Sequence, residues 1–313
     1  MKKAIVTTTI NKPTEAIVKF CEIAQLREWK FIIIGDQKTP HEQYEALEKK
    51  YDNRVEYWHP ELQVKHFPEL SEVLGWNTIQ RRNIGFVIAY NWGAEVIATI
   101  DDDNIPLDNW GKNIYVNKQV TTDLYKVEEN PVFDPLAVSR SSHLWHRGFP
   151  IELLSTKNDV THYIANETRT VLVQADLWNG DPDVDAICRI AYQPEVHDLI
   201  RGHFFADPLV PFNSQNTFLS RTVFPAYFLF PGIGRMDDIW ASYIMQLQFP
   251  KSVLINEPTV YQKRNKHDLY KDLEAEMIGY RNTLNLITHL ESWSGFIPQK
   301  SYHAYQVYRG YFR

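Results

Sequence analysis

The stretch Glu95-Val-Ile-Ala-Thr-Ile-Asp-Asp-Asp-Asn104 joins an apolar run to three adjacent carboxylates. Residues 95–100 predict a buried strand, so the carboxylates follow its carboxyl end directly. Adjacent carboxylates repel one another, and a divalent cation that prefers oxygen ligands, such as Mg²⁺ or Mn²⁺, relieves that repulsion. In an α/β sheet, a cation at this end of a strand lies where a pyrophosphate binds. The alternative is an acidic turn whose Asp and Asn side chains only bond to nearby backbone donors.

The composition indicates a globular protein that does not bind nucleic acid. The chain has 313 residues, of which 44% are hydrophobic, and its net charge of −6 disfavours binding by neutralisation of many phosphates. An anionic ligand would instead be recruited by a local cation. Cys21 and Cys188 are too few for a disulfide framework, and no Cys/His pattern indicates zinc. No signal sequence or membrane span is recognisable, so we expect a cytoplasmic protein.

The first hundred residues alternate between apolar runs and stretches with helical periodicity. Strands are expected at 4–9, 30–34 and 55–58, and helices at 14–29, 40–51 and 69–91. This alternation predicts an α/β fold with a mostly parallel central sheet flanked by helices. Between 130 and 231, aromatic, proline and turn residues predict packed loops and short strands that form a binding face. Helical periodicity returns at 237–248 and 267–290, and we expect one continuous domain over residues 1–313.

The predicted strand ends carry polar side chains. Ligands of an open parallel sheet bind beyond the carboxyl ends of its strands, and these ends carry Thr8, Thr9 and Asp36 besides the acidic run. Hydroxyls and a carboxylate suit a ribose and a pyrimidine edge, although Thr is also common in strands and Asp in turns. Arg82 and Asn83 lie on the helix that leads to the acidic run. They could donate to a phosphate or a base, or could lie on a solvated helix face.

Short motifs along nearly the whole chain resemble those of one family and occur in the same order. Examples are Gly35-Asp-Gln-Lys-Thr-Pro40, Trp145-His-Arg-Gly-Phe-Pro150 and Gly234-Arg-Met-Asp-Asp-Ile-Trp240. The others lie at residues 8–14, 82–85, 101–104, 129–131, 179–185 and 211–217. With these motifs the chain resembles the STELLO family of candidate glycosyltransferases, which is similar to the reversibly glycosylated polypeptides, the UDP-arabinopyranose mutases. The resemblance implies a GT-A fold, with a Rossmann-like nucleotide-binding half at about 1–105 and a sugar and acceptor half with the C-terminal helices at about 106–313.

The resemblance also implies a metal-binding DxD motif. A divalent ion, Mn²⁺ or Mg²⁺, would bridge the motif and the donor diphosphate, with Asp103 as the most direct ligand. Asp101 would face the ribose or the sugar, and Asp102 would also contact the nucleotide sugar. The metal would stabilise the departing nucleoside diphosphate. Because Tyr261-Gln262 replaces the tyrosine–histidine pair of the mutases, we expect His267 as the third metal ligand; the alternative is a surface histidine at a helix N-terminus.

The second carboxylate pair, Asp237 and Asp238, is predicted to supply the catalytic base, and Asp238 is the residue expected to act as that base. An inverting transfer needs one base that deprotonates the acceptor hydroxyl on the side of the sugar away from the metal. A helix N-terminus stabilises the charged carboxylate. The alternative is a plain N-cap with a first-turn acid. Asp183 or Asp185 is expected to contact sugar hydroxyls, and Asn216 to contact the nucleotide sugar.

Arg147 distinguishes two activities. It stands at the place of the arginine that is reversibly glycosylated in the mutases. A guanidinium beside a diphosphate can equally steady the leaving group as a fixed cation. We favour this second catalytic role because the segment that follows, Ile151-Glu-Leu-Leu154, differs from that of the mutases.

An aromatic stripe with a basic edge lies near the C-terminus. It consists of Tyr302, Tyr305, Tyr308 and Tyr311 with Arg309 and Arg313. The stripe could dock on the inner face of a membrane, where acceptors on lipid carriers would lie. Packing against the domain body or against a second copy of the chain, as in a homo-oligomer, is the favoured alternative.

Residues and resemblance together predict a metal-dependent, inverting glycosyltransferase. It would move a sugar from a UDP-linked donor, of galactofuranose or galactose type, to a carbohydrate acceptor in surface polysaccharide synthesis. Two alternatives remain: a nucleotide-sugar mutase, which interconverts ring forms without an acceptor, and a non-catalytic scaffold with the same fold. The two carboxylate clusters disfavour the scaffold, because a scaffold does not need them.

Overall fold

The computed structural model describes residues 1–264 and 268–312. Its first half alternates strands and helices, as the sequence predicts. These elements are β1 (Lys3–Thr9), α1 (Glu15–Leu26), β2 (Lys30–Gly35), α2 (His41–Tyr51), β3 (Val55–Trp58), α3 (Pro60–His66), α4 (Pro68–Leu74), α5 (Arg82–Trp92) and β4 (Val96–Ile100). The helix expected over residues 69–91 is interrupted: α4 ends at Gly75, which adopts a positive φ of 73°, and a turn of 3₁₀-helix at Ile79–Arg81 precedes α5.

The second half is richer in strands. Its elements are β5 (Asn104–Pro106), β6 (Gln119–Val127), β7 (Val160–Thr170), β8 (Val173–Gly180), α6 (Ala186–Tyr192), β9 (His203–Asp207), β10 (Asn216–Ser220), α7 (Asp237–Gln248), β11 (Val253–Gln262), α8 (Leu269–Thr288) and α9 (Gln299–Arg309). The expected mixture of loops and short strands at 130–231 therefore contains β7 to β10 and one short helix. The helix expected at 267–290 corresponds to α8; residue 267 of the expected range lies outside the described residues.

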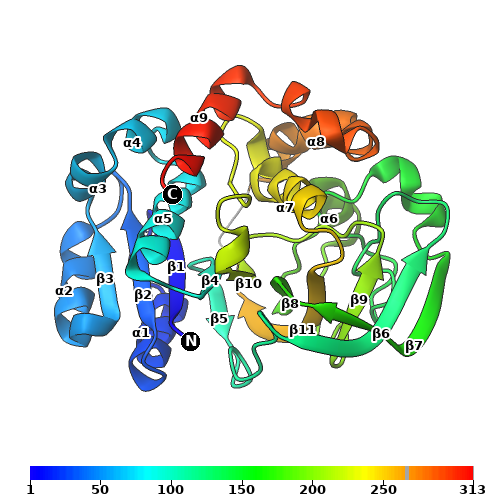
Figure 1. Cartoon of the computed structure of the whole chain (residues 1–313), viewed down its shortest axis with the longest axis horizontal. Coiled ribbons are helices and arrows are strands. Elements are labelled where there is room, and N and C mark those ends of the chain that lie inside the picture. The colour runs from blue at the N-terminus through cyan, green and yellow to red at the C-terminus, as the bar shows by residue number, and fades with distance from the viewer. Residues whose placement is uncertain (265–267, 313) are drawn as a thin grey trace.

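One sheet runs through both halves of the described chain (Figure 1). Its strands lie in the order β3-β2-β1-β4-β10-β8-β11-β9-β6-β7, and β5 pairs with β11. The four strands of the first half are parallel, whereas the pairs beyond β4 are mixed. This arrangement confirms the predicted α/β class. Because β1 and β4 are parallel neighbours, their carboxyl ends meet at one edge of the sheet.

Apolar side chains on both faces of the first-half strands hold the helices in place. On β2, Phe31 packs edge-on against Phe20 of α1, with ring centroids 6.2 Å apart. On the opposite face, α5 approaches so closely that a Cβ on Gly85 would lie 3.1 Å from a side-chain carbon of Ile34. A strand with two buried faces reads as a continuous apolar run, which explains why these strands could be predicted from sequence.

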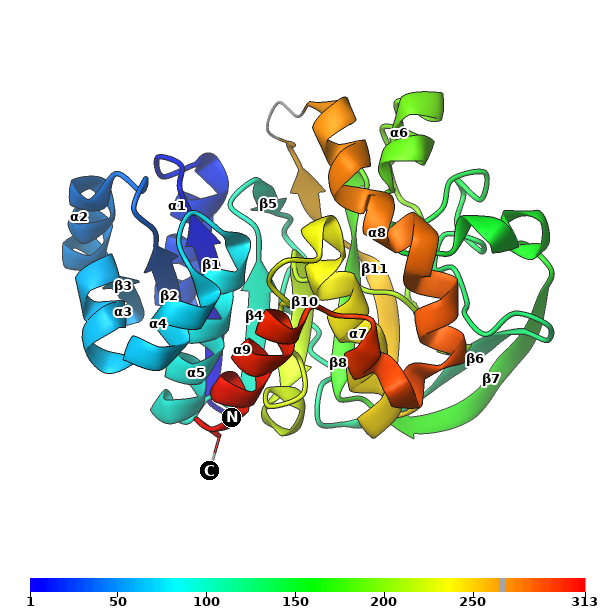
Figure 2. The same ribbon diagram turned by 90° about the horizontal axis from the view of Figure 1, so that it is seen from above.

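The C-terminal tyrosine stripe packs against the domain body. Tyr305 and Tyr308 of α9 are buried, and the hydroxyl of Tyr308 donates to the backbone oxygen of Phe224 at 2.7 Å. Figure 2 shows α9 in front of the sheet, beside α4. Tyr311 stacks edge-on against Phe67, while Arg313 lies outside the described residues. The structure thus has the favoured packing against the body, and none of its described helices is both long and apolar enough to cross a bilayer.

Candidate functional site

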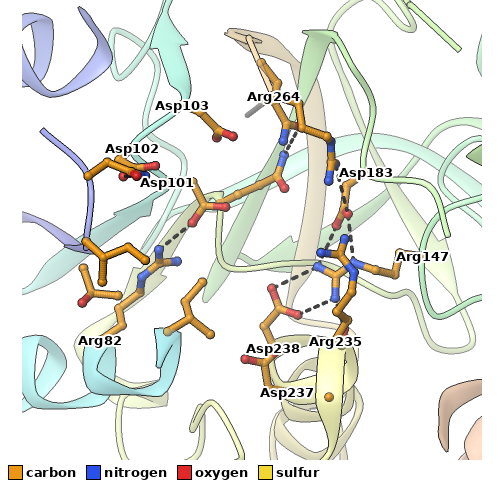
Figure 3. Close-up of a pocket in the computed structure, with 17 residues that line it drawn as sticks. Arg82, Asp101, Asp102, Asp103, Arg147, Asp183, Arg235, Asp237, Asp238 and Arg264 are labelled. Carbon is orange, nitrogen blue, oxygen red and sulfur yellow. Dashed lines mark hydrogen bonds and ion pairs between the residues drawn. The ribbon is translucent and has the colours of Figure 1, made fainter. Parts of the chain in front are cut away.

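A cavity of about 420 Å³ opens at the carboxyl ends of β1 and β4 and is closed on its far side by the second half of the chain (Figure 3). It is rich in charged side chains from elements far apart in the sequence. Its lining residues are Thr8, Ile10, Asn11, Ile79, Arg82, Asp101, Asp102, Asp103, Arg147, Asp183, Gln215, Gly234, Arg235, Asp237, Asp238, Gln262 and Arg264. We call this cavity the central pocket.

The acidic run forms one wall of the central pocket, and hydrogen bonds fix its position. Asp102 accepts hydrogen bonds from the hydroxyl of Thr9 and from the side-chain amide of Asn11, the latter at 2.9 Å. Burial raises the pKa of Asp102. Arg82 donates to Asp101 at 2.5 Å and to the backbone oxygen of Ser214 at 2.8 Å. The run is therefore tied to β1 through Asp102 and to α5 through Asp101, so it is not a free acidic turn.

The oxygen atoms on this wall suit a hard cation that is shared with a ligand. Among residues 1–264 and 268–312, no three His, Cys, Asp or Glu side chains converge on one point as a complete metal cage. Mg²⁺ usually takes only one or two protein carboxylates and completes its shell with substrate phosphates and water. Asp101 and Asp103, which both line the central pocket, could supply such a pair. The predicted third ligand, His267, lies outside the described residues.

Arg147 dominates the opposite wall and is held by two carboxylates (Figure 3). Its Nε and Nη2 donate to the two oxygens of Asp183, both at 2.9 Å, and its Nη1 and Nη2 donate to Asp238 at 3.0 and 3.3 Å. Although burial opposes it, the two aspartates raise the pKa of Arg147 well above its usual value. Burial likewise acts against ionised Asp183, but Arg147 lowers its pKa well below the usual range. The trio is a buried ion-pair network in which one guanidinium lies between two carboxylates.

Asp237 and Asp238 begin α7 but have different surroundings. Asp238 accepts hydrogen bonds from the backbone N–H and the hydroxyl of Ser214, at 2.9 and 3.1 Å, in addition to those from Arg147. Asp237 accepts one from Gln80 at 2.6 Å, and burial together with neighbouring Asp238 raises its pKa to about 7. Neither carboxylate caps the helix, because Met236 occupies the N-cap position. The N-cap part of the alternative is therefore wrong, whereas both aspartates do lie in the first turn of α7.

Two further arginines line the central pocket and were not predicted. Arg235 donates from Nε to Glu276 of α8 at 2.8 Å, and Arg264 lies 3.3 Å from Asp181. Arg235 stands inside a motif that had already been singled out, one residue before Met236. Arg264 follows the carboxyl end of β11, so the rule that ligands bind beyond strand ends would have found it if that strand had been recognised.

Besides Thr9, four of the predicted binding residues do not line the central pocket. Their side chains instead satisfy buried backbone and side-chain groups. Asn83 exchanges two hydrogen bonds with the backbone of Leu229, at 2.9 and 3.0 Å. Asp36 accepts from the backbone N–H of Thr78 at 3.1 Å. In this structure both residues fix loops behind the pocket wall.

The other two are Asp185 and Asn216. Asp185 is the N-cap of α6, and it also accepts a hydrogen bond from the indole of Trp145 at 2.5 Å. Asn216 accepts from Trp110 at 3.0 Å and donates to Thr259 at 2.9 Å inside the sheet. Of the predicted sugar contacts, the structure thus places Asp183 in the central pocket and Asp185 outside it. Thr8 lines the pocket, and Thr9 acts through Asp102.

Gly148, the residue after Arg147, packs closely against α7, so a substitution of Gly148 should destabilise the protein. Gly148 has a φ of +89°, and a Cβ there would collide with Ile239 of α7. Gly148→Ala should therefore destabilise the protein by about 2–5 kcal/mol, from backbone strain and overpacking together. Gly202→Ala is the matched control, because Gly202 has a φ of +74° and open space around it. Urea unfolding of both variants measures the difference, and equal losses would contradict the close packing of α7 on Gly148.

Comparisons with known proteins agree with the resemblance seen in the motifs. No family model matches the chain. The chain is 26% identical over 198 residues to "Probable glycosyltransferase STELLO1" of Arabidopsis thaliana, and 25% identical over 197 residues to "Probable glycosyltransferase STELLO2" of the same plant. Each match covers 59% of this chain and 24% of the relative, so the likeness spans about a quarter of the length of these curated relatives. The predicted similarity to STELLO-type proteins is confirmed.

Among solved structures, the chain is similar to the mannosyltransferase PcManGT from Pyrobaculum calidifontis in complex with GDP-Man and Mn²⁺. The TM-score is 0.44 and the identity 9%, over 99% of this chain and 69% of that one. It is also similar to residues 1–349 of TarS from S. aureus, with a TM-score of 0.44 and an identity of 8%, over the full length of this chain and 90% of that one.

Proposed function

We propose that this protein is a glycosyltransferase that binds a nucleotide-sugar donor in the central pocket together with a divalent ion. The observation that carries the proposal is the layout of the pocket: the acidic run forms one wall, and the network of Arg147, Asp183 and Asp238 forms the other. A donor diphosphate fits the first wall through a shared cation, and the reacting sugar then faces the second. The confirmed similarity to STELLO-type proteins supports the same reading.

The nucleoside end of the donor has a place next to the acidic run. A smaller cavity of about 200 Å³ adjoins the central pocket and shares Thr8, Ile10, Asn11, Ile79 and Asp102 with it. Ile10 and Ile79 are 45% and 40% exposed, so two apolar side chains are accessible for contact with a planar base. We propose that a nucleoside, uridine in the simplest case, binds here.

The diphosphate would be held by a Mg²⁺ or Mn²⁺ ion on Asp101 and Asp103. When bound, such an ion would neutralise the charge that grows on the departing nucleoside diphosphate. Arg82 keeps Asp101 in place, because its guanidinium donates hydrogen bonds both to this carboxylate and to the backbone oxygen of Ser214. The protein's own contribution at this wall is therefore to orient carboxylates that repel one another.

Asp237 is the better placed of the two candidate bases. Both oxygens of Asp238 already accept hydrogen bonds from Arg147, and one of them also accepts two from Ser214. The pKa of about 7 at Asp237 is close to the value at which a carboxylate accepts a proton efficiently near neutral pH. We therefore assign Asp237 as the base of an inverting transfer, and Asp238 as the residue that fixes Arg147.

The surroundings of Arg147 disfavour the mutase alternative. A glycosylated arginine must first offer a nitrogen lone pair, which requires loss of a proton. Here Nε, Nη1 and Nη2 all donate to carboxylates, and the pKa of Arg147 is raised. These contacts support a permanently charged Arg147 that holds Asp183 and Asp238 in position, and they leave it no N–H for a diphosphate on the opposite wall. Incubation with UDP-sugars and no acceptor should give no ring interconversion; interconversion without release of UDP would favour the mutase.

The acceptor is proposed to be a carbohydrate, as in surface polysaccharide synthesis. A galactofuranose or galactose donor, a cytoplasmic location and peripheral contact with the inner face of a membrane belong to the same proposal. So does assembly into a homo-oligomer. The carbohydrate acceptor and the donor sugar are proposed from the resemblance, whereas membrane contact and the homo-oligomer are proposed from the C-terminal aromatic and basic stretch.

Asp103→Ala tests the metal wall. The variant should weaken Mn²⁺-dependent binding of a UDP-sugar by more than about tenfold. Removing a residue that only hydrogen-bonds to a metal ligand already weakens metal binding by about tenfold or more, and Asp103 is proposed to be a ligand itself. Asp108→Ala is the matched control, because Asp108 is exposed and lies outside the central pocket. Isothermal titration calorimetry with and without Mn²⁺ gives both affinities. Equal affinities of the Asp103 variant and the parent would remove this residue from the site.

A further inference from the structure

A second large cavity lies toward the β7 edge of the sheet, and its lining is separate from that of the central pocket. Its volume is about 410 Å³. It is formed by β6, by β9 and by two loops. The lining residues are Asp123, Tyr125, Val138, Ser139, Arg140, Leu199, Ile200, Arg201, His203 and Phe204. We call it the edge cavity.

An aromatic platform lies in the edge cavity. The ring of Tyr125 is half-buried and stacks on His162 of β7, with ring centroids 4.3 Å apart and planes inclined by 13°. Phe204 meets the same tyrosine edge-on at 5.1 Å. These two contacts fix the plane of the Tyr125 ring. His162 covers one face of the ring, so only its remaining exposed part can offer an apolar surface and a hydroxyl to a sugar.

Two cations stand beside this platform. Arg140 and Arg201 both line the edge cavity, both are exposed, and neither forms an ion pair with any residue in the described part of the chain. The one carboxylate in the lining, Asp123, is engaged with His162 at 2.8 Å. Guanidinium groups without a protein carboxylate can form two parallel hydrogen bonds to a carboxylate or phosphate of a ligand.

The segments that line the edge cavity continue into the wall of the central pocket. The backbone N–H of Arg140 donates to Leu199 at 2.9 Å, so the two lining loops are joined. Arg140 lies seven residues before Arg147, a distance of at most about 25 Å along the chain. On the other loop, Val196 exchanges two hydrogen bonds of 2.8 Å with Gly180, directly before the segment that carries Asp183. A short oligosaccharide can span such a distance.

We propose that the edge cavity is a binding subsite for an acidic glycan, the extended part of the acceptor whose end reaches the central pocket. A sugar ring contacts the part of Tyr125 that His162 and Phe204 leave exposed, and Arg140 and Arg201 bind its carboxylate or phosphate. This inference rests on the proposed function, because it assigns a chemical class to the acceptor. It also names residues that select the acceptor without taking part in the reaction at the central pocket.

The test compares a charged glycan with its neutral form. A tetramer of galacturonic acid and its methyl ester are titrated into the wild-type protein and into an Arg140→Gln/Arg201→Gln variant. An Arg281→Gln/Lys300→Gln variant, which removes two exposed cations elsewhere, is the matched control. The acid should bind the wild type at least about tenfold more tightly than the ester does, as expected for charge-assisted hydrogen bonds. This preference should vanish in the Arg140/Arg201 variant, remain in the control, and weaken with salt.

The remaining outcomes separate this inference from the proposed function. A ribitol phosphate oligomer is titrated as the second arm; if it alone shows the arginine-dependent binding, the acidic glycan is a phosphodiester. If both anionic probes bind the wild type and the Arg140/Arg201 variant equally, or if neither binds, the inference is overturned. UDP-sugar binding in Mn²⁺ is measured on all three proteins. If the wild type binds the donor but no glycan, this inference alone is overturned. If none of the three proteins binds the donor, the proposed function is overturned.

Discussion

Asp237→Asn should lower the rate of sugar transfer by about 10²–10⁴-fold, the usual contribution of a positioned general base. The affinity for the nucleotide sugar should stay nearly unchanged, because the substitution keeps the shape of the side chain and lies on the wall away from the acidic run. The amide can still bond to Gln80, which holds Asp237 at 2.6 Å. Release of UDP in the presence of acceptor measures the rate, and calorimetry measures donor binding.

The pH profile gives a second readout for Asp237. Burial and neighbouring Asp238 raise its pKa to about 7. A base acts only when it is deprotonated, so kcat/KM of the parent should fall as the pH drops below about 7. In the Asp237→Asn variant this fall should be absent. Asp108→Asn is the control, since Asp108 is exposed. A variant with the rate and the pH profile of the parent would show that the base lies elsewhere.

Arg147→Met should reduce the free energy of unfolding by about 3–5 kcal/mol, the cost of leaving a buried charge without its partner. The variant removes the guanidinium that bonds to both Asp183 and Asp238. The two buried carboxylates then lack their cation and repel each other. Urea unfolding at pH 7 measures the loss. The exposed Arg140, changed to Met, is the control and should stay within about 0.5 kcal/mol of the parent.

Two further comparisons identify the cause of that loss. Adding Asp183→Asn to Arg147→Met should recover part of the stability, since it removes one of the unpaired charges. The deficit should also shrink as the pH falls from 7 toward 4. Without Arg147, burial raises the pKa of Asp183, and a group with a raised pKa stabilises the folded state at low pH and loses that effect as the pH rises. A loss below about 1 kcal/mol at pH 7 would contradict the buried network.

Most of the first half of the fold could be predicted because β1, β2 and β4 have two buried faces. Such strands leave continuous apolar runs, as at residues 30–34, and the polar residues that follow them mark the sheet edge. The acidic run and Thr8 were found in this way, and both line the central pocket. In the second half, strands of mixed direction, from the three residues of β5 to the eleven of β7, lie among aromatic loops, and periodicity identifies neither their ends nor their partners.

The network at Arg147 shows what sequence patterns alone miss. Arg147 meets Asp183 across 36 positions of the chain and Asp238 across 91. Motif order named all three residues, but only the tertiary structure shows that both carboxylates pair with the one guanidinium. Conversely, Asn83 and Asn216 lie in motifs and yet bond to neighbouring protein groups. An amide side chain serves a buried carbonyl as well as a ligand, so its residue type does not reveal which it binds.

The most direct test of the central claim is the affinity of the wild-type protein for a UDP-sugar, measured by calorimetry in Mn²⁺ and again in excess chelator. We expect binding in Mn²⁺ that weakens by more than about tenfold when the metal is removed, because the diphosphate would then face three carboxylates without a cation between them. The same affinity in both solutions would contradict a metal-bridged donor site on Asp101 and Asp103.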